Sequence, residues 1–367
     1  MKKVLRVFAA LLAVLLLFSG CDFTPKSLNG EAAKRPNIIE NYDLKVFLQA
    51  QDDQAKENLY ALYHAIVNFE ASCYLPYPVP QEQAQNLLVM LCYECPELFQ
   101  VDLTQPTTYH SYEGESNVFA VDFPYCMDKA TYEPLLAQAK QALGRFETEG
   151  MSLLEAEEYI YDILCHQITY NTTAPHSANV YGALVEGQAK CDGIAKAMKW
   201  AMEKAGYSCM CVDGHPHDGG IGHAWNIIPV DGHYYHLDLT ADVQSESRHE
   251  PYYPAYNVSA DFITSVYAPG SWCPVPAEQD MQASYHAQKG NFFEPGANWK
   301  SAVKKLFVSA YKANGTFTVQ FATLADFEAC IASLENLFRE AAREADIHHW
   351  SWTTTYISQY HLLSVKV

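Results

Sequence analysis

Residues 181–198 read Tyr-Gly-Ala-Leu-Val-Glu-Gly-Gln-Ala-Lys-Cys-Asp-Gly-Ile-Ala-Lys-Ala-Met. From Cys191 onwards apolar side chains recur at helical spacing and Gly206 supplies a stop, so the pattern predicts a helix that begins near Cys191. The first turn of a helix leaves backbone N–H groups unpaired, and these favour a thiolate or an oxyanion. Gly187 and Gly193 favour a close backbone approach or an unusual turn, which a cysteine that merely packs in a core does not need.

Two polar blocks follow this cysteine along the chain. His223 lies in Gly-His-Ala-Trp-Asn, and Asp238 lies in Tyr-Tyr-His-Leu-Asp-Leu-Thr. A thiol, an imidazole and a carboxylate are the minimum set for acyl transfer through a thioester. In such a set His223 takes the proton of Cys191 or shares an ion pair with the thiolate, and Asp238 fixes the tautomer of the imidazole.

The segment between the two blocks predicts their geometry. The Asp-Gly pair at 231–232 suits a two-residue hairpin turn with positive φ, which pairs Val230 with His233. That register makes His223 and Asp238 diagonal neighbours on one face of the hairpin, about 7–8 Å apart at the backbone. A loop of odd length would turn Asp238 to the other face, so the register tests the proposed triad.

Residues 181–242 resemble the transglutaminase-like superfamily, whose papain-like fold is shared by transglutaminases and bacterial transglutaminase-like cysteine peptidases. The matching blocks are Gly-x-x-x-Cys-x-Gly before a helix, Gly-His-Ala-Trp-Asn, and Tyr-Tyr-His-x-Asp-x-Thr-x-Asp. The resemblance implies an α+β fold in which the cysteine-bearing helix packs on an antiparallel sheet. It also implies a Cys191, His223 and Asp238 triad in a cysteine peptidase, amidase or acyltransferase that needs no cofactor.

The substrate cleft is less well defined by the sequence than the triad. Ile194 stands where the family usually has an aromatic residue, and Ala241 stands where many members have Trp. Trp225 is expected to wall the cleft. Tyr181 and Gln188 are further cleft residues and candidates for the second oxyanion donor, which the sequence leaves open.

A zinc site is the rival interpretation of the same region. His215, His217 and Asp218, together with Cys191 and His223, offer ligand types that zinc accepts. The segment 215–222 is rich in glycine, however, and ligands need fixed geometry. We therefore interpret it as a flexible lip over the cleft and expect no metal.

The N-terminus predicts export. Lys2, Lys3 and Arg6 precede an apolar run at 7–18, which is too short to span a bilayer comfortably, and Ser-Gly-Cys21 follows. This arrangement resembles the lipobox of bacterial lipoproteins, which implies cleavage before Cys21, lipid on Cys21, and anchoring at the outer face of the bacterial cytoplasmic membrane. An ordinary secretory signal with a free Cys21 is the alternative.

The amino-acid composition limits which kinds of partner the chain can bind. The net charge of −19 argues against nucleic acid and anionic lipid headgroups as ligands, because phosphate binding needs clustered cations. Membrane attachment therefore comes from the lipid, and we expect a protein, peptide or cell-wall peptide substrate. A non-catalytic module that binds peptide or wall fragments is the competing class, since fold does not imply function. The oligomeric state stays open.

A chain of 367 residues predicts more than one unit. We divide it into a signal peptide, a tether, an N-terminal α+β region, a transglutaminase-like domain and a C-terminal α+β unit, at 1–20, 21–35, 36–150, 151–295 and 296–367. No catalytic pattern is visible in the two flanking units, and Cys92-Tyr-Glu-Cys95 is interpreted as structural. Periodicity predicts helices at 52–69, 81–95, 129–147, 152–167 and 324–344, and strands at 107–112, 118–123, 207–213, 223–229, 233–240, 305–311, 316–322 and 353–366.

Overall fold

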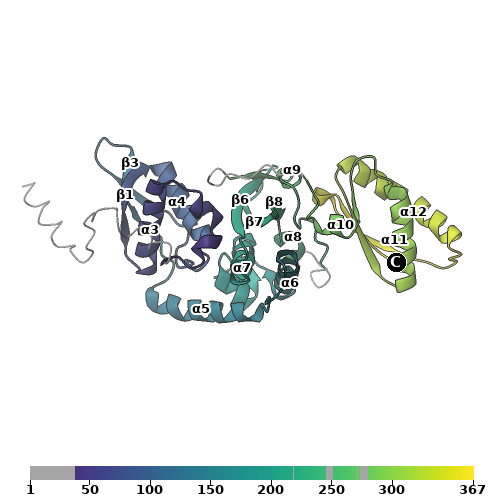
Figure 1. The fold of residues 1–367 in the computed structure, drawn as a ribbon, viewed down its shortest axis with the longest axis horizontal. Coiled ribbons are helices and arrows are strands. Elements are labelled where there is room, and N and C mark those ends of the chain that lie inside the picture. Colours follow the sequence, from purple (N-terminus) through teal and green to yellow (C-terminus); the bar gives the residue numbers. More distant parts are fainter. Residues whose placement is uncertain (1–37, 218, 245–250, 271, 273–279) are drawn as a thin grey trace, which may run out of the picture. The chain divides into compact units, whose positions relative to one another are not determined.

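The computed structural model describes residues 38–367 except 218, 245–250, 271 and 273–279 (Figure 1). Cys21, the expected signal peptide and the expected tether lie outside the described residues. Glu40–Val367 form one compact unit. This unit mixes helices with mainly antiparallel sheets, so the predicted α+β class is confirmed.

The N-terminal part packs helices against a three-stranded sheet of order β1-β3-β2. It contains η2 (Tyr42–Leu44), α2 (Val46–Gln49), α3 (Asp53–Val67), β1 (Ser72–Pro80), α4 (Gln81–Glu94), β2 (Thr108–Ser111) and β3 (Asn117–Asp122). The predicted hairpin of 107–112 with 118–123 is confirmed by the pairing of β2 with β3. The sequence does not indicate β1, because its three prolines cannot donate to a ladder; such a strand is tolerated at a sheet edge, where β1 lies.

The central part carries the cysteine helix. After α5 (Lys129–Ala142) and η3 (Leu143–Arg145), α6 (Leu153–Gln167) begins with the predicted capping box, in which Glu155 accepts from the backbone N–H of Ser152 at 2.8 Å. Helix α7 (Cys191–Lys204) packs on α6 and on β7. The antiparallel sheet has the order β8-β7-β6-β9, with bounds β6 (Met210–Pro216), β7 (His223–Val230), β8 (His233–Leu237) and β9 (Tyr267–Pro269).

Short elements connect the longer helices and strands of the central part. They are β4 (Thr169–Tyr170), the π-helical turn η4 (Gly182–Glu186), β5 (Gln188–Ala189), α8 (Thr240–Val243), α9 (Ala260–Thr264) and α10 (Tyr285–Gln288). The strand predicted at 233–240 is therefore too long, because β8 ends at Leu237 and α8 begins at Thr240.

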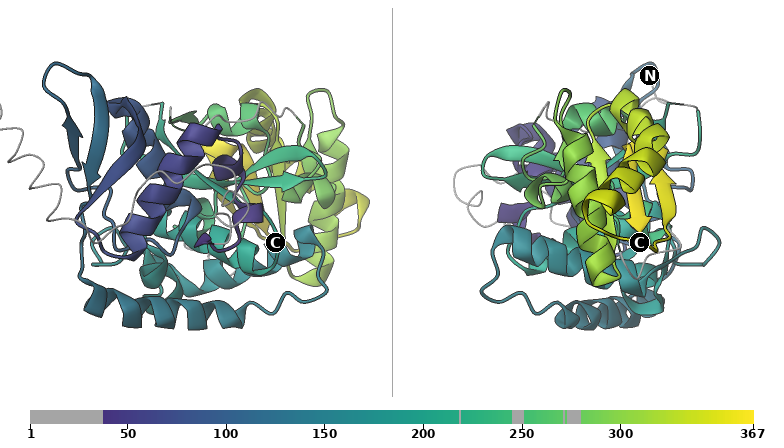
Figure 2. Two further views of the ribbon diagram at one scale, coloured as in Figure 1. Left: turned by 60° about the vertical axis from the view of Figure 1, so that its left-hand side comes forward. Right: turned by 90° about the vertical axis from the view of Figure 1, so that its right-hand side faces the viewer.

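The C-terminal part has a hydrophobic core of its own. Helices α11 (Trp299–Ala313) and α12 (Leu324–Glu344), light green to yellow in Figure 2, pack on a sheet of order β10-β11-β13-β12. Its remaining elements are β10 (Phe292–Phe293), β11 (Thr316–Phe321), β12 (Thr353–Ile357), η5 (Ser358–Tyr360) and β13 (Leu362–Lys366). The strand predicted at 305–311 is wrong: Val303, Phe307 and Ala310 fall on one buried helical face.

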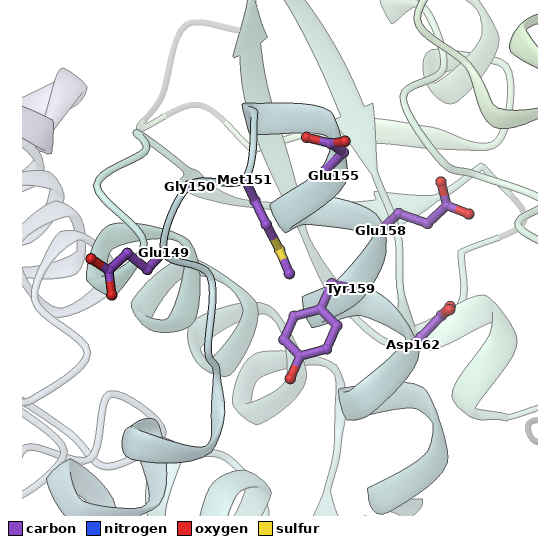
Figure 3. A pocket seen from close by; sticks show the side chains of 7 residues that line it. All are labelled: Glu149, Gly150, Met151, Glu155, Glu158, Tyr159 and Asp162. Carbon is purple, nitrogen blue, oxygen red and sulfur yellow. The ribbon is translucent and has the colours of Figure 1, made fainter.

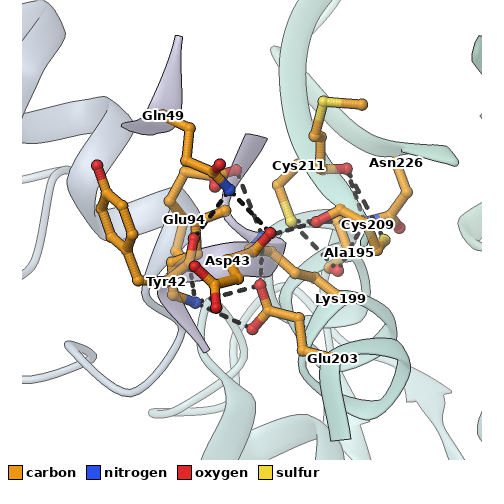
Figure 4. Close-up of polar contacts among 12 residues, drawn as sticks. Tyr42, Asp43, Gln49, Glu94, Ala195, Lys199, Glu203, Cys209, Cys211 and Asn226 are labelled. Carbon is orange, nitrogen blue, oxygen red and sulfur yellow. Dashed lines mark hydrogen bonds and ion pairs between the residues drawn. The ribbon is translucent and has the colours of Figure 1, made fainter. Parts of the chain in front are cut away.

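Buried charges tie α7 to the N-terminal part (Figure 4). The Lys199 ammonium lies 2.7 Å from the Glu203 carboxylate and donates to the Cys209 carbonyl at 2.6 Å. The Lys45 ammonium lies 3.0 Å from the same carboxylate and donates to the Glu94 carbonyl at 2.6 Å. Removing one member of such a buried pair costs about 3–5 kcal/mol of folding stability. These contacts therefore fix the position of α7 against α4.

None of the helices in the described part of the chain is long and apolar enough to cross a membrane.

Candidate active site

Cys191 is the first residue of α7. The preceding Lys190 has extended backbone angles and forms the N-cap, so the free N–H groups of the first turn surround the thiol end of the helix. The Cys191 side chain is 6% exposed. A nearly buried sulfur at the positive end of a helix dipole is a favourable place for negative charge.

The glycines on either side of Cys191 have the predicted roles. Gly187 has φ +64°, in the left-handed region. A Cβ on Gly193 would lie 2.4 Å from the carbonyl oxygen of Ser177, which itself accepts from the Lys190 N–H at 2.9 Å. The loop before α7 therefore lies directly against the first turn of the helix, and only glycine fits at 193.

The N-terminal part also contacts the start of α7. The Tyr93 hydroxyl donates to Asp192 at 2.8 Å, and the Asp192 carboxylate lies 3.1 Å from the Lys190 ammonium. The Lys196 ammonium lies 4.7 Å from the centre of the Tyr93 ring. These contacts fix the residues on both sides of Cys191.

His223 and Asp238 meet as the hairpin predicts. The ladder pairs Val230 with His233 and runs to Asn226 opposite Leu237, which is the predicted register. Both turn residues have positive φ, +50° at Asp231 and +86° at Gly232. One residue beyond the ladder, the Asp238 carboxylate lies 2.8 Å from His223 Nε2.

The electrostatics of this pair favour a charged imidazole. Burial lowers the pKa of His223, but the Asp238 charge, its hydrogen bond and the hydrogen-bonded Cys191 side chain outweigh burial and raise that pKa to about 10. Burial raises the pKa of Asp238, yet the His223 charge and the hydrogen bonds that Asp238 accepts lower it overall. Because Nε2 faces Asp238, the ring nitrogen left to serve Cys191 is Nδ1.

Asn226 links the helix to the strand that carries His223. Its side-chain amide donates to the Ala195 carbonyl in α7 at 2.9 Å and to the Met210 carbonyl in β6 at 3.3 Å. A shift of α7 along β7 would break the first of these bonds. Asn226 thus helps to hold Cys191 and His223 in register.

Residues 140–239 match the family model of the transglutaminase-like superfamily, and this segment contains Cys191, His223 and Asp238. The chain contains a transglutaminase-like domain. No curated protein matches the chain.

Two solved structures are similar to parts of the chain. One is a Cytophaga hutchinsonii protein proposed to be a cysteine protease, at 14% identity and a TM-score of 0.24, covering 37% of this chain and 61% of that one. The other is a TGase, at 10% identity and a TM-score of 0.28, covering 62% of this chain and 59% of that one. The chain thus spans about three fifths of the length of each.

Trp225 lies in β7, two residues after His223. It is 1% exposed, and its indole N–H donates to His236 Nδ1 at 2.9 Å. Its ring stacks on Tyr267 at 5.3 Å, and Tyr267 in turn stacks on His223 at 4.6 Å. The buried Trp225 side chain packs beside His223 and Tyr267, and its role as a wall of the cleft stays a prediction.

Tyr181 and Gln188 both lie on the segment that leads into α7. The half-buried Tyr181 ring packs edge-on against His176 at 5.1 Å. Gln188 is exposed, and its side-chain oxygen accepts from Asn171 at 2.7 Å. Their roles as cleft residues or as oxyanion donors stay predictions.

The sequence gives no sign of two hydroxyls that reach the triad. Tyr267 and Tyr360 lie 3.3 Å and 3.0 Å from Asp238 Oδ2, with Tyr360 supplied by the C-terminal part. Both belong to regions that sequence reasoning treats as loop or as a non-catalytic unit. No local pattern marks either residue, because their partner is far away in the sequence.

The zinc interpretation finds no cluster to support it in the described residues. His217 Nε2 donates to the Thr264 carbonyl at 2.7 Å, and Asp218 lies outside the described residues. Among the residues that the structure describes, no group of three or more His, Cys, Asp or Glu side chains is placed to hold a metal ion.

A separate acidic hollow lies at the start of α6 (Figure 3). It has a volume of about 460 Å³ and contains none of the triad residues. Three of its carboxylates have partners in the fold: Glu155 caps α6, Glu158 lies 3.7 Å from Lys289, and Asp162 accepts from Tyr253. We therefore assign it no catalytic role.

The charge state of His223 is directly testable. NMR titration of the His223 ring should find an imidazolium that persists above neutral pH, with a pKa near 10. Asp238→Asn keeps the shape but removes the charge, so the pKa should fall from about 10 toward its ordinary value of about 6.5. The stabilisation from the pair is full between about pH 4, above the ordinary pKa of Asp238, and about pH 6.5, and it is lost as pH rises through 10.

The matched control is Asp122→Asn, which removes a carboxylate 2.8 Å from the part-exposed His110. It should leave the His223 titration unchanged. An His223 ring that titrates near 6.5 in both the wild-type chain and Asp238→Asn would contradict the electrostatic account.

Proposed function

We propose that this protein is a lipid-anchored extracytoplasmic cysteine enzyme. It acts on amide bonds of a protein, peptide or cell-wall peptide through a thioester on Cys191, with His223 and Asp238 completing the triad. The observation that carries the proposal is the 2.8 Å contact between His223 and Asp238, with Cys191 hydrogen-bonded to the same imidazole.

The first half of the reaction forms the thioester. The Cys191 thiolate attacks the amide carbonyl carbon, and the developing oxyanion is positioned near the free N–H groups at the start of α7. The carbon–nitrogen bond then breaks, and the His223 imidazolium gives its proton to the departing amine or ammonia. Asp238 keeps the ring aligned and stabilises its positive charge throughout.

The second half releases the acyl group. Neutral His223 takes a proton from water or from an amine, whose oxygen or nitrogen attacks the thioester carbon. The sulfur leaves as a thiolate, which restores the starting ion pair with a carboxylic acid or a new amide as product. For a protein anchored at a bacterial surface we favour hydrolysis over crosslinking. These steps need no cofactor.

The other cysteines that the structure describes provide an internal comparison for the reactivity of Cys191. Burial raises the pKa of Cys92 and Cys211 to about 12 each, so these thiols stay protonated at neutral pH. Cys126 is exposed, and its thiol donates to the backbone carbonyls of Phe99 and Gln100. Partial burial raises the pKa of Cys126, so this residue shows how fast an accessible but unactivated thiol of this chain reacts.

Selective alkylation tests the proposal. With iodoacetamide at pH 7, Cys191 should react about tenfold faster than Cys126, because the thiolate is the reactive form. His223→Ala should bring the Cys191 rate down to that of Cys126, and Cys191→Ala should remove the fast phase. Peptide mapping by mass spectrometry assigns each label. Equal rates for Cys191 and Cys126 in the wild-type chain would favour a non-catalytic binding module.

Metabolic labelling tests the anchor. In a bacterial host given an alkyne-tagged fatty acid, the full chain should carry the tag and sediment with membranes. Cys21→Ala should lose the tag, whereas Cys126→Ala should keep it. An untagged wild-type chain, or a tag that survives in Cys21→Ala, would contradict lipid attachment at Cys21.

A further inference from the structure

A tyrosine from the C-terminal part reaches the buried side of the triad. Tyr360 is the last residue of η5, is 0% exposed, and its hydroxyl donates to Asp238 Oδ2 at 3.0 Å. Tyr267 in β9 places its hydroxyl 3.3 Å from the same oxygen and 3.2 Å from the Tyr360 hydroxyl. Tyrosines 93 positions apart in the chain thus share one carboxylate.

We propose that Tyr360 is a positioning residue of the active site, whose hydroxyl holds the Asp238 carboxylate toward His223. This inference rests on the proposed function. It makes the C-terminal part a component of the catalytic machinery.

The hydrogen bonds that Asp238 accepts hold its carboxylate in one orientation. Oδ1 accepts the backbone N–H of Thr240 at 3.1 Å, and Oδ2 accepts from His223 at 2.8 Å. Tyr360 adds a donor to Oδ2, and Tyr267 can give its single proton either to Oδ2 or to the oxygen of Tyr360. Rotating the carboxylate away from His223 would therefore break several charge-assisted bonds at once.

Tyr360 is itself held rigidly. The Gln320 side-chain amide in β11 donates to the Tyr360 carbonyl at 3.1 Å and to the Pro254 carbonyl at 2.7 Å. The Tyr360 ring stacks on Phe262 of α9 at 6.5 Å. These contacts come from both the central and the C-terminal parts, so the hydroxyl position depends on how the two pack together.

The groups that face Asp238 define what a pH profile would report. They are His223 from β7, Tyr267 from β9, Tyr360 from η5 and, further off, Tyr161 of α6. Burial raises the pKa of each tyrosine well above neutral, so none of them ionises between pH 4 and about 9. The Tyr161 hydroxyl donates to Asp242, whose pKa burial raises to about 6, and Asp242 titrates equally in the wild type and in a Tyr360 variant.

Tyr360→Phe in the full chain tests the proposal, because it removes the hydroxyl and keeps the ring. The rate constant for Cys191 alkylation, measured from pH 3 to 9, should fall about tenfold on the low-pH side of the profile and little on the neutral plateau. The low-pH limb of this rate profile should move up by about one pH unit, since the lost hydrogen bond stabilised the charged Asp238 carboxylate. Tyr132→Phe removes another buried hydroxyl, which donates to the Glu97 carbonyl at 2.7 Å, and should leave the profile unchanged.

The outcomes separate the two proposals. A Tyr360→Phe profile that superimposes on that of the wild type, with selective Cys191 alkylation intact, overturns the role of Tyr360 alone. Loss of that selectivity in the wild type overturns the proposed function itself. If Tyr360→Phe does not fold, 3-fluorotyrosine at position 360 provides a stronger donor and should move the low-pH limb down; an unmoved limb overturns the inference.

Discussion

A buried carboxylate that faces an imidazole is the interaction on which the rest of the structure depends. Asp238 is 1% exposed, and an uncompensated charge at such a position would cost several kcal/mol. The cost is offset because every side of the carboxylate meets a donor: His223, Thr240, Tyr267 and Tyr360. In return, the buried negative charge keeps the imidazole protonated and ready to pair with a thiolate.

The donors come from separate segments of the chain, and several contacts of the fold bring these segments together. The two-residue turn after Val230 sets the hairpin register that joins His223 to Asp238. The contact of Asn226 with Ala195 then sets α7, and with it Cys191, against the same strand. The buried ion pairs of Lys45 with Glu203 and of Lys199 with Glu94 fix the helix from the N-terminal side (Figure 4).

Local chemistry made much of this predictable from sequence. The turn at 231–232 admits few conformations, so the register and the His223–Asp238 contact follow from it. The start of α7 follows from helix periodicity and the glycines around Cys191. By contrast, the error at 305–311 arose where β-branched and aromatic residues suggested a strand, although their spacing buries one face of α11.

The parts that sequence could not predict depend on tertiary contacts. Trp225 stands in a recognisable motif, but its burial is decided by the neighbouring strands and by His236, whose pKa burial lowers to about 3. Tyr360 carries no local pattern at all. Its role appears only when η5 of the C-terminal part packs beside Asp238.

Covalent trapping of the acyl group tests the central claim most directly. When the purified chain is mixed with p-nitrophenyl acetate, intact-protein mass spectrometry should find a single acetyl group, and hydroxylamine should remove it as it removes a thioester. Peptide mapping should assign that acetyl group to Cys191, and Cys191→Ala should gain none. An acetyl group spread over other cysteines, or equal acetylation of wild type and Cys191→Ala, would contradict a thiolate activated by His223 and Asp238.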